Sequence, residues 1–175
     1  ADAQDRALQC FYKTGQFEVF KQKFDQLSAH GQHASVLLGT LSTHYATMAF
    51  GKATNSGNIQ LCVAGHNPPM LITNGKVETI NSTGIPVGLF CESEYEMVNI
   101  DLHKGDSLVL YSDGLTEASA NEIEYGEDRL KQHLCKSMNL SARNLLNSII
   151  NDQKGFLKDS PLFDDITVSV LAKTN

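Results

Sequence analysis

The spacing of apolar residues divides the chain into a helical start, a β-rich middle, and two helices followed by one last strand. Residues 17–27 place their aromatic and leucine side chains on one face of a helix, with charged residues elsewhere on the helical wheel. The leucines within residues 37–41 indicate one or two further helical turns. From about residue 45 the pattern changes, and strands are predicted instead.

Short strands separated by turn residues are predicted across the middle of the chain. They cover residues 46–50, 59–64, 70–73, 77–80, 95–102 and 107–111. Asn74-Gly75 separates two of them, and this pair is a strong hairpin signal because both residues tolerate a positive φ. Residues 107–111 are almost uninterruptedly apolar, as expected for a strand in a sheet that is buried on both faces.

Two helices and one strand complete the predicted fold. Leu130 and Leu134 lie one helical turn apart, and Ser141 is expected to cap a second helix that buries the apolar residues within 145–150. Residues 166–171 form the closing strand. This order of elements favours an α+β layered fold over a doubly wound βαβ fold. Since no repeat, low-complexity segment or linker is visible, residues 1–175 are predicted to form a single domain.

Composition narrows the possible classes of function. The 175 residues, 41% hydrophobic and 19% charged, are typical of one globular domain. The net charge of −6 argues against a nucleic-acid surface, and no apolar stretch approaches the roughly 20 residues of a membrane span. No signal peptide is visible, and the four cysteines lie far apart without a Cys-x-x-Cys pair. A cytoplasmic protein with reduced thiols is therefore expected.

Carboxylates occur where two predicted strands meet solvent. Asp113 follows the strand at residues 107–111 closely, and Asp164 and Asp165 precede the last strand. Carboxylates on adjacent strand ends can lie at metal-binding distance, and Mg²⁺ or Mn²⁺ needs only two or three of them because it keeps several waters. The alternatives are an Asp-Gly turn and a pair of acids that keeps an edge strand soluble. Glu117 is interpreted as a solvated or capping residue, with support of the metal site as the alternative.

Histidines offer a second kind of candidate chemistry. Residues 65–69 read Gly-His-Asn-Pro-Pro, in which the prolines force an extended turn and Gly65 allows a close approach of the backbone. His66 could bind phosphate or shuttle a proton, although a histidine in a tight turn more often makes structural hydrogen bonds. His30 and His33 have helical spacing for a metal, but no third ligand is evident and a polar helix end is the alternative.

Six short motifs occur in the order found in one protein family. They are VAGHNPP at residues 63–69, GIPVGL at 84–89, KGD at 104–106, YSDGLTE at 111–117, YGEDRL at 125–130 and DDIT at 164–167. In these motifs the chain resembles the SpoIIE/RsbU branch of the bacterial PPM-type, metal-dependent serine/threonine phosphatases. The resemblance covers about residues 45–171 and implies a four-layer α-β-β-α sandwich. The two antiparallel sheets of that fold hold a centre of two Mn²⁺ or Mg²⁺ ions at one edge.

The resemblance also implies a reaction and a set of site residues. The reaction is hydrolysis of phosphoserine or phosphothreonine on a partner protein, such as a phosphorylated anti-sigma-factor antagonist. Asp113 and Asp164 become metal ligands and catalytic residues, and Asp165 joins the metal set as a neighbour that orients Asp164 or a bound water. Gly65, His66 and Gly114 become residues of the substrate or active-site loops. Two metal ions can activate a water for attack on phosphorus, so no covalent nucleophile is needed. Neither nucleic acid nor membrane insertion is expected, and a homodimer is one option for assembly.

One motif of the family is incomplete in this chain. Residues 25–31 match the Asp-x-x-Gly-His-Gly motif only in part. Gln26 stands at the position of the Asp, with Asp25 one residue away, and Ala29 stands at the position of the first Gly. The missing Asp could lie before Ala1 in a longer signalling protein, so that this chain lacks part of the N-terminal half of the fold. Alternatively, the site is catalytically impaired and the domain binds phosphoproteins without hydrolysing them. A third reading is a plain α+β interaction domain whose aspartates occupy turns.

Overall fold

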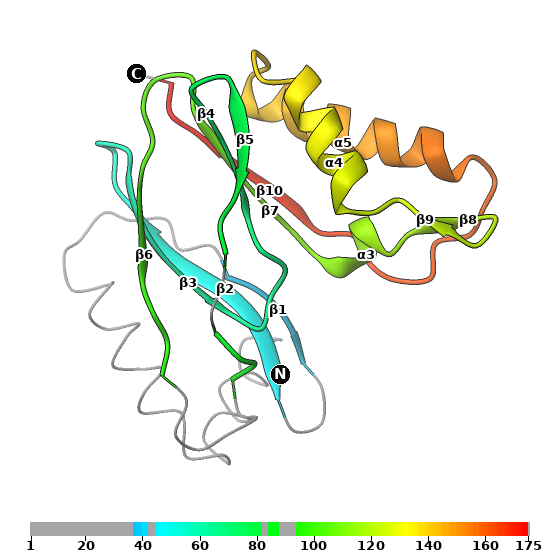
Figure 1. Cartoon of the computed structure of the whole chain (residues 1–175), viewed down its shortest axis with the longest axis horizontal. Helices are drawn as coiled ribbons and strands as arrows, with labels where there is room; N and C mark the ends of the chain where they lie inside the picture. Colours follow the sequence, from blue (N-terminus) through cyan, green and yellow to red (C-terminus); the bar gives the residue numbers. More distant parts are fainter. Residues whose placement is uncertain (1–36, 42–44, 82–83, 88–93, 175) are drawn as a thin grey trace. The chain divides into compact units, whose positions relative to one another are not determined.

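The computed structural model describes residues 37–41, 45–81, 84–87 and 94–174 (Figure 1). They fall into two compact units. Unit 1 is Ala1–His66 with Ser82–Asp101, and unit 2 is Asn67–Asn81 with Leu102–Asn175. Three predictions lie outside the described residues: the helix at residues 17–27, the partial motif match at residues 25–31, and the possible metal site at His30 and His33.

Unit 1 contains a four-stranded antiparallel sheet. Its strands, in spatial order, are β1 (Leu37–Leu41), β2 (Ala46–Ala53), β3 (Asn58–Ala64) and β6 (Val98–Asp101). The helical turns predicted for residues 37–41 are therefore wrong, because this segment pairs with β2 from Leu37↔Phe50 to Leu41↔Ala46. A short leucine-rich run suits a strand as well as a helix, and here the hydrogen bonds of the neighbouring strand decide between them.

Unit 2 contains a second four-stranded antiparallel sheet. Its strands, in spatial order, are β10 (Val168–Ala172), β7 (Ser107–Tyr111), β4 (Met70–Thr73) and β5 (Lys76–Thr79). All five residues of β7 are buried, and this strand pairs on one side with β10 and on the other with β4. Asn74 and Gly75 join β4 to β5 with φ values of 50° and 72°. Both features agree with the sequence prediction.

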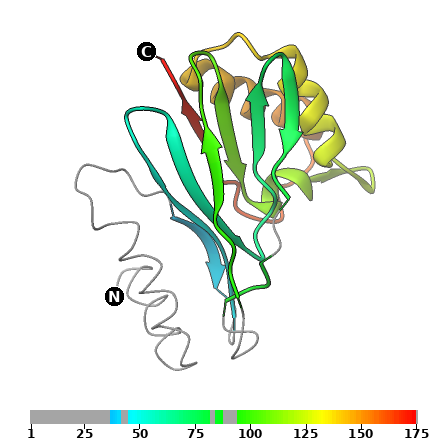
Figure 2. The same cartoon turned by 60° about the vertical axis from the view of Figure 1, so that its left-hand side comes forward.

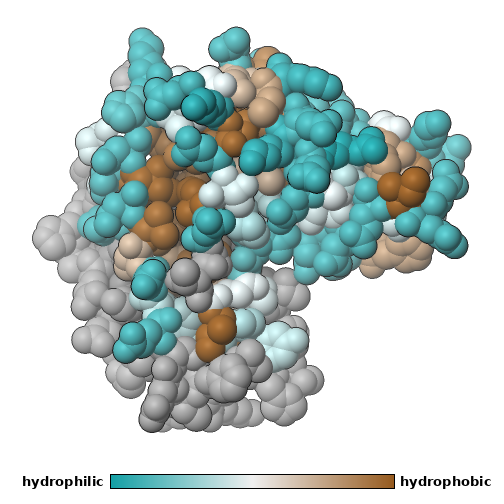
Figure 3. Space-filling model, viewed as in Figure 1, coloured by the Kyte–Doolittle hydropathy of each residue, from teal (hydrophilic) through white to brown (hydrophobic). Residues whose placement is uncertain are grey.

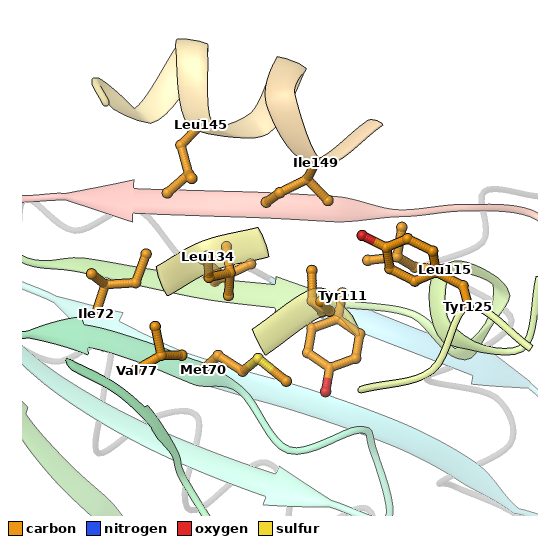
Figure 4. Close-up of a cluster of buried hydrophobic side chains, with 11 residues drawn as sticks. Met70, Ile72, Val77, Tyr111, Leu115, Tyr125, Leu134, Leu145 and Ile149 are labelled. Carbon is orange, nitrogen blue, oxygen red and sulfur yellow. The ribbon is translucent and has the colours of Figure 1, made fainter. Parts of the chain in front are cut away.

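Helices and a small hairpin complete unit 2. They are α3 (Asp113–Thr116), β8 (Ser119–Ala120), β9 (Ile123–Glu124), α4 (Glu127–Lys136) and α5 (Ala142–Leu157) (Figure 2). Helix α5 packs on β10, and α4 packs on β4 and β5. In Figure 4, Leu145 and Ile149 of α5 point toward the sheet and join a buried cluster with Tyr111. Ser141 caps α5 as predicted, since its hydroxyl accepts a hydrogen bond from the Asn144 amide at 3.4 Å.

The prediction of an α+β fold with two antiparallel sheets is confirmed, and the stacking into four layers stays a prediction. No helix in the described part of the chain is long and apolar enough to cross a membrane.

Candidate functional site

The first candidate residue, Asp113, lies where β7 passes into the short helix α3. Ser112 ends the extended backbone with φ −81° and ψ 161°, and Asp113 is the first residue of α3. The carboxylate of Asp113 is half-buried, and its Oδ1 atom accepts a hydrogen bond from the Gly114 amide at 3.0 Å. Because α3 begins directly at the end of a buried strand, the position of Asp113 is set by the sheet.

Ser112 connects this end of β7 by hydrogen bonds to the segment that precedes β10. Its amide donates to the Thr167 carbonyl at 2.9 Å, and its hydroxyl accepts from the Thr167 amide at 2.9 Å. The same hydroxyl donates to the Asp165 carbonyl at 3.2 Å. Three hydrogen bonds from one residue thus hold the two acidic segments side by side.

Gly114 brings the two segments into direct backbone contact. A Cβ atom at this position would overlap the carbonyl oxygen of Asp165 and would lie 3.4 Å from the carbonyl carbon of Asp164. No side chain other than hydrogen fits in this space without a shift of the Asp164-Asp165 backbone. The sequence motifs around Asp113 and Asp164 are therefore neighbours in the folded unit.

Asp164 and Asp165 are exposed on the segment that Ser112 and Gly114 hold. The Oδ1 atom of Asp164 accepts a hydrogen bond from the Asp165 amide at 2.7 Å. In both Asp113 and Asp164, Oδ1 thus accepts a hydrogen bond from the amide of the next residue. Their Oδ2 atoms accept no hydrogen bond from the described residues. Carboxylate oxygens that are held on one side and open on the other suit a hard divalent cation that keeps its own waters.

The described ranges contain no group of three or more His, Cys, Asp or Glu residues arranged to hold a metal ion. Asp113, Asp164 and Asp165 by themselves therefore do not form such a group. The two segments that meet at the end of β7 carry Asp113, Gly114, Asp164 and Asp165, four of the six predicted site residues.

The other two predicted residues, Gly65 and His66, belong to unit 1. Gly65 has φ +64°, and its amide donates to the Gly84 carbonyl at 2.7 Å. A Cβ atom on Gly65 would lie 2.5 Å from Cγ of Pro86, so the expected close approach of the backbone is made to Pro86. His66 is buried, with 9% of its surface exposed. Their role in a substrate loop stays a prediction.

Several polar contacts support the turn at Asp113. The Thr116 hydroxyl donates to the Asp113 carbonyl at 3.2 Å, and the Asn67 side-chain amide donates to that hydroxyl at 3.5 Å. The exposed Glu117 ends α3, and its amide donates to the Asp113 carbonyl at 2.8 Å. Glu117 is thus an exposed residue at the end of α3, in agreement with its interpretation as a solvated or capping residue.

A buried tyrosine connects the end of β7 with helix α4. The Tyr111 hydroxyl donates to Glu127 Oε1 at 3.2 Å. Burial of the ring, and to a lesser extent the Glu127 carboxylate, raise the pKa of Tyr111 above its ordinary value. The phenol therefore stays protonated and continues to donate this bond, which ties Glu127 of α4 to the last residue of β7.

The sequence by itself assigns no role to Ser112, Asn67 or the Tyr111–Glu127 pair. A hydroxyl residue between a buried strand and an Asp-Gly pair is a signal for local turn hydrogen bonds. The partners of Ser112 lie more than 50 residues away, at Asp165 and Thr167, and no local pattern specifies them.

Comparison with known proteins gives the family. A family model for stage II sporulation protein E (SpoIIE) matches residues 18–174. Protein IcfG of Synechocystis sp. (strain ATCC 27184 / PCC 6803 / Kazusa) is 32% identical over 128 residues, which are 71% of this chain and 20% of IcfG. Phosphoserine phosphatase RsbU of Bacillus subtilis (strain 168) is 25% identical over 171 residues, which are 89% of this chain and 50% of RsbU. The chain thus spans half or less of the length of these two curated relatives.

A solved structure has the same fold. The SiaA-PP2C domain of Pseudomonas aeruginosa matches with a TM-score of 0.63 and 13% sequence identity, over 76% of this chain and 54% of that domain. At this identity the likeness concerns the fold alone, and the family model carries the assignment. The chain belongs to the SpoIIE family, in the SpoIIE/RsbU branch of the PPM-type phosphatases.

Proposed function

We propose that this chain hydrolyses phosphoserine or phosphothreonine on a partner protein, with Asp113 and Asp164 as metal ligands. One observation carries the proposal: Ser112 and Gly114 hold the segments of these two aspartates against each other. Membership of the SpoIIE family supports a phosphatase reaction, and the curated relative RsbU is named a phosphoserine phosphatase.

The donor chemistry supports Mn²⁺ or Mg²⁺ as the cofactor, and we propose two ions. Asp113 and Asp164 supply oxygen ligands, which these hard cations prefer to nitrogen or sulfur. Asp165 stabilises Asp164 through its backbone amide, which donates to Asp164 Oδ1 at 2.7 Å. The side chain of Asp165 is exposed and is proposed to complete the metal set or to orient a bound water.

When bound, the metal centre would supply an activated water and neutralise charge on the phosphoryl oxygens. The chain's own contribution is to orient the ligands. Ser112 and Gly114 keep Asp113 and Asp164 at one place, so that the carboxylates need little rearrangement to bind a cation. Such preorganisation matters because a misplacement of about 1 Å at a reacting centre can cost on the order of a hundredfold in rate.

The proposed substrate is a phosphorylated regulatory protein, such as an anti-sigma-factor antagonist in a partner-switching pathway. The net charge of −6 agrees with a protein partner rather than nucleic acid.

A second function, phosphoprotein binding without hydrolysis, has one observation in its favour. Within the described ranges, Asp113, Asp164 and Asp165 do not form a group of three side chains that could hold a metal ion. If the protein lacks the metal-binding Asp that the family carries upstream of Asp113, the chain would bind a phosphoprotein without hydrolysing its phosphate.

The test is metal-dependent release of p-nitrophenol from p-nitrophenyl phosphate. We expect activity with MnCl₂ or MgCl₂, loss of activity with a chelator, and loss in Asp113→Asn. Asp128→Asn is the matched control, because Asp128 is an exposed aspartate in the first turn of α4. Turnover that needs metal and survives Asp113→Asn would contradict the assignment of Asp113. Saturable binding of a phosphoserine peptide without any turnover would favour the second function.

A further inference from the structure

Two large apolar side chains are exposed directly beside the candidate site. Leu162 and Phe163 lie in the loop between α5 and β10, immediately before Asp164, and are 55% and 80% exposed. Phe163 is the most exposed large hydrophobic residue of the described part of the chain. A single exposed apolar residue is ordinary on a protein surface. Contiguous exposed apolar surface, in contrast, marks interaction sites, and Leu162 and Phe163 are adjacent in the chain and next to a candidate catalytic residue.

The loop that carries these side chains is attached at both ends. On one side, the Lys158 amide donates to the Lys154 carbonyl and the Ser160 amide donates to the Leu157 carbonyl, each at 2.9 Å. On the other side, the Asp165 carbonyl accepts from Ser112 and lies against Gly114. Phe163 is therefore only two residues from a backbone position that the sheet holds, and its distance from Asp164 is set by the chain itself.

The loop is acidic, and a further exposed apolar residue lies in the β8–β9 hairpin, whose strand β8 contacts α5. Between residues 155 and 167 the acidic residues are Asp159, Asp164 and Asp165, and the only basic residue is Lys158. In the neighbouring hairpin, Ile123 is 62% exposed and lies between the exposed Glu122 and Glu124. In Figure 3, brown colour at the β8–β9 end of unit 2 interrupts a surface that is mostly teal there. Apolar contacts in an acidic surrounding favour a partner with apolar and basic side chains.

We propose that Leu162 and Phe163 form a docking surface for the segment of the substrate protein that carries the phosphoserine. The occupant is a segment with a large apolar residue close to the phosphoserine and with basic rather than acidic residues beyond it. An exposed aromatic and an aliphatic side chain lose apolar contact with water when such a segment covers them, and aromatic residues are enriched at protein interfaces. This inference rests on the proposed function, because the phosphate of the segment would lie at the metal ions that Asp113 and Asp164 are proposed to hold.

The test compares two fluorescein-labelled phosphoserine peptides that differ only in having Phe or Ser beside the phosphoserine, both with arginines at one end. Their binding to the whole chain is measured by fluorescence anisotropy in the presence of MnCl₂. We expect the wild type to bind the Phe peptide about tenfold more tightly than the Ser peptide, as is typical of one well-covered apolar contact. The double variant Leu162→Ser/Phe163→Ser should bind both peptides equally and lose about tenfold for the Phe peptide.

The matched control is Leu140→Ser. Leu140 is also an exposed leucine, at 38%, but it precedes α5, whereas Leu162 follows it. Helix α5, 16 residues and therefore about 24 Å long at 1.5 Å per residue, lies between the two positions in the chain. The control should bind both peptides as the wild type does.

The other outcomes overturn either the docking surface or the proposed function. Equal binding of the two peptides by the wild type, or an equal loss in Leu140→Ser, refutes the docking surface. A dimer in sedimentation velocity that the double variant abolishes would assign Leu162 and Phe163 to a second copy of the chain and likewise refute it. Preferential binding of the Phe peptide without hydrolysis of p-nitrophenyl phosphate refutes the proposed function and leaves the docking surface standing.

Discussion

Ser112 and Thr167 are joined by two hydrogen bonds of 2.9 Å, one from backbone to backbone and one from the Thr167 amide to the Ser112 hydroxyl. The Ser112 carbonyl is engaged elsewhere, since it accepts from the Leu115 amide at 3.1 Å and so begins α3. The hydroxyl therefore accepts the bond that a backbone carbonyl accepts in a regular antiparallel pair. Because of this exchange, β7 can turn into α3 at Asp113 while its pairing with the chain before β10 continues for one more residue.

Replacing Ser112 tests whether this pairing positions the metal ligands. Ser112→Ala removes two hydrogen bonds, to Asp165 and from Thr167, and we expect the free energy of unfolding to fall by about 1 kcal/mol. If Asp164 is a ligand, the affinity for Mn²⁺ should also fall, by roughly tenfold, a loss like that caused by removing a group that orients a metal ligand. Urea unfolding and calorimetric titration with MnCl₂ measure the two effects.

Ser112→Thr is the conservative control for this change, since it keeps the hydroxyl. It should retain most of the Mn²⁺ affinity. An alanine variant that loses stability but binds Mn²⁺ as tightly as the wild type would show that Ser112 has only a structural role.

Gly114→Ala is expected to disrupt the contact between the two acidic segments. The new Cβ would overlap the Asp165 carbonyl oxygen, which is backbone and cannot rotate away. We expect a loss of about 1–3 kcal/mol in the free energy of unfolding, as for other overpacked sites, together with loss of Mn²⁺-dependent phosphatase activity. Urea unfolding and the p-nitrophenyl phosphate assay check the two outcomes.

Gly155→Ala is the matched control. Gly155 lies within α5, and a Cβ atom there meets nothing within 4 Å. Alanine is the better helix former by about 1 kcal/mol, so this variant should be more stable than the wild type and equally active. Equal behaviour of the two alanine variants would contradict the close contact at Gly114.

Asp152 is predicted to stabilise the packing of α4 on α5 without affecting the site. Its Oδ2 accepts from the Tyr125 hydroxyl at 2.7 Å, and its Oδ1 lies 3.2 Å from His133 Nδ1. Asp152→Ala would leave the Tyr125 hydroxyl without its acceptor and remove the contact with His133, and we expect a loss of about 1–3 kcal/mol in the free energy of unfolding by urea. Phosphatase activity below the unfolding transition should stay at the level of the wild type, and an equal loss of activity would contradict this separation.

The stability of the protein should fall at high pH. Burial is the main cause that raises the pKa of Tyr111 and of Tyr125, and hydrogen bonds to Glu127 and Asp152 add to it. In the unfolded chain both phenols lose their protons near pH 10, whereas in the folded protein they keep them to higher pH. The unfolded state therefore binds fewer protons above about pH 10, and the free energy of unfolding decreases as the pH rises further.

Urea unfolding between pH 8 and pH 11 measures this dependence. Tyr125→Phe should lower stability at pH 8, because the bond to Asp152 is lost, and should flatten the decrease above pH 10. An unchanged slope in this variant would refute the assignment to Tyr125.

Local signals in the sequence determined much of unit 2. The uninterrupted apolar run is β7, the Asn74-Gly75 pair is the turn with two positive φ values, and Ser141 caps α5. Each of these features depends on residues that are neighbours in the chain, so conformational propensity and residue spacing are enough to predict it. The leucines at residues 37–41 form a strand because β2 supplies their hydrogen bonds, which a local pattern does not specify. The short helix α3 and the β8–β9 hairpin likewise have no periodicity long enough to predict them.

The candidate site was likewise predictable from the sequence only in part. The sequence by itself identified Asp113, Asp164 and Asp165 as carboxylates at strand ends, because an acidic residue beside an apolar run is visible in the letters alone. Only the tertiary structure decided that the two segments touch, and that Ser112 and the missing side chain of Gly114 make the contact. The reason is physical: the pairing of β7 with β10 is non-local, and hydrogen bonds between residues so far apart in the chain exist only once the sheet has formed.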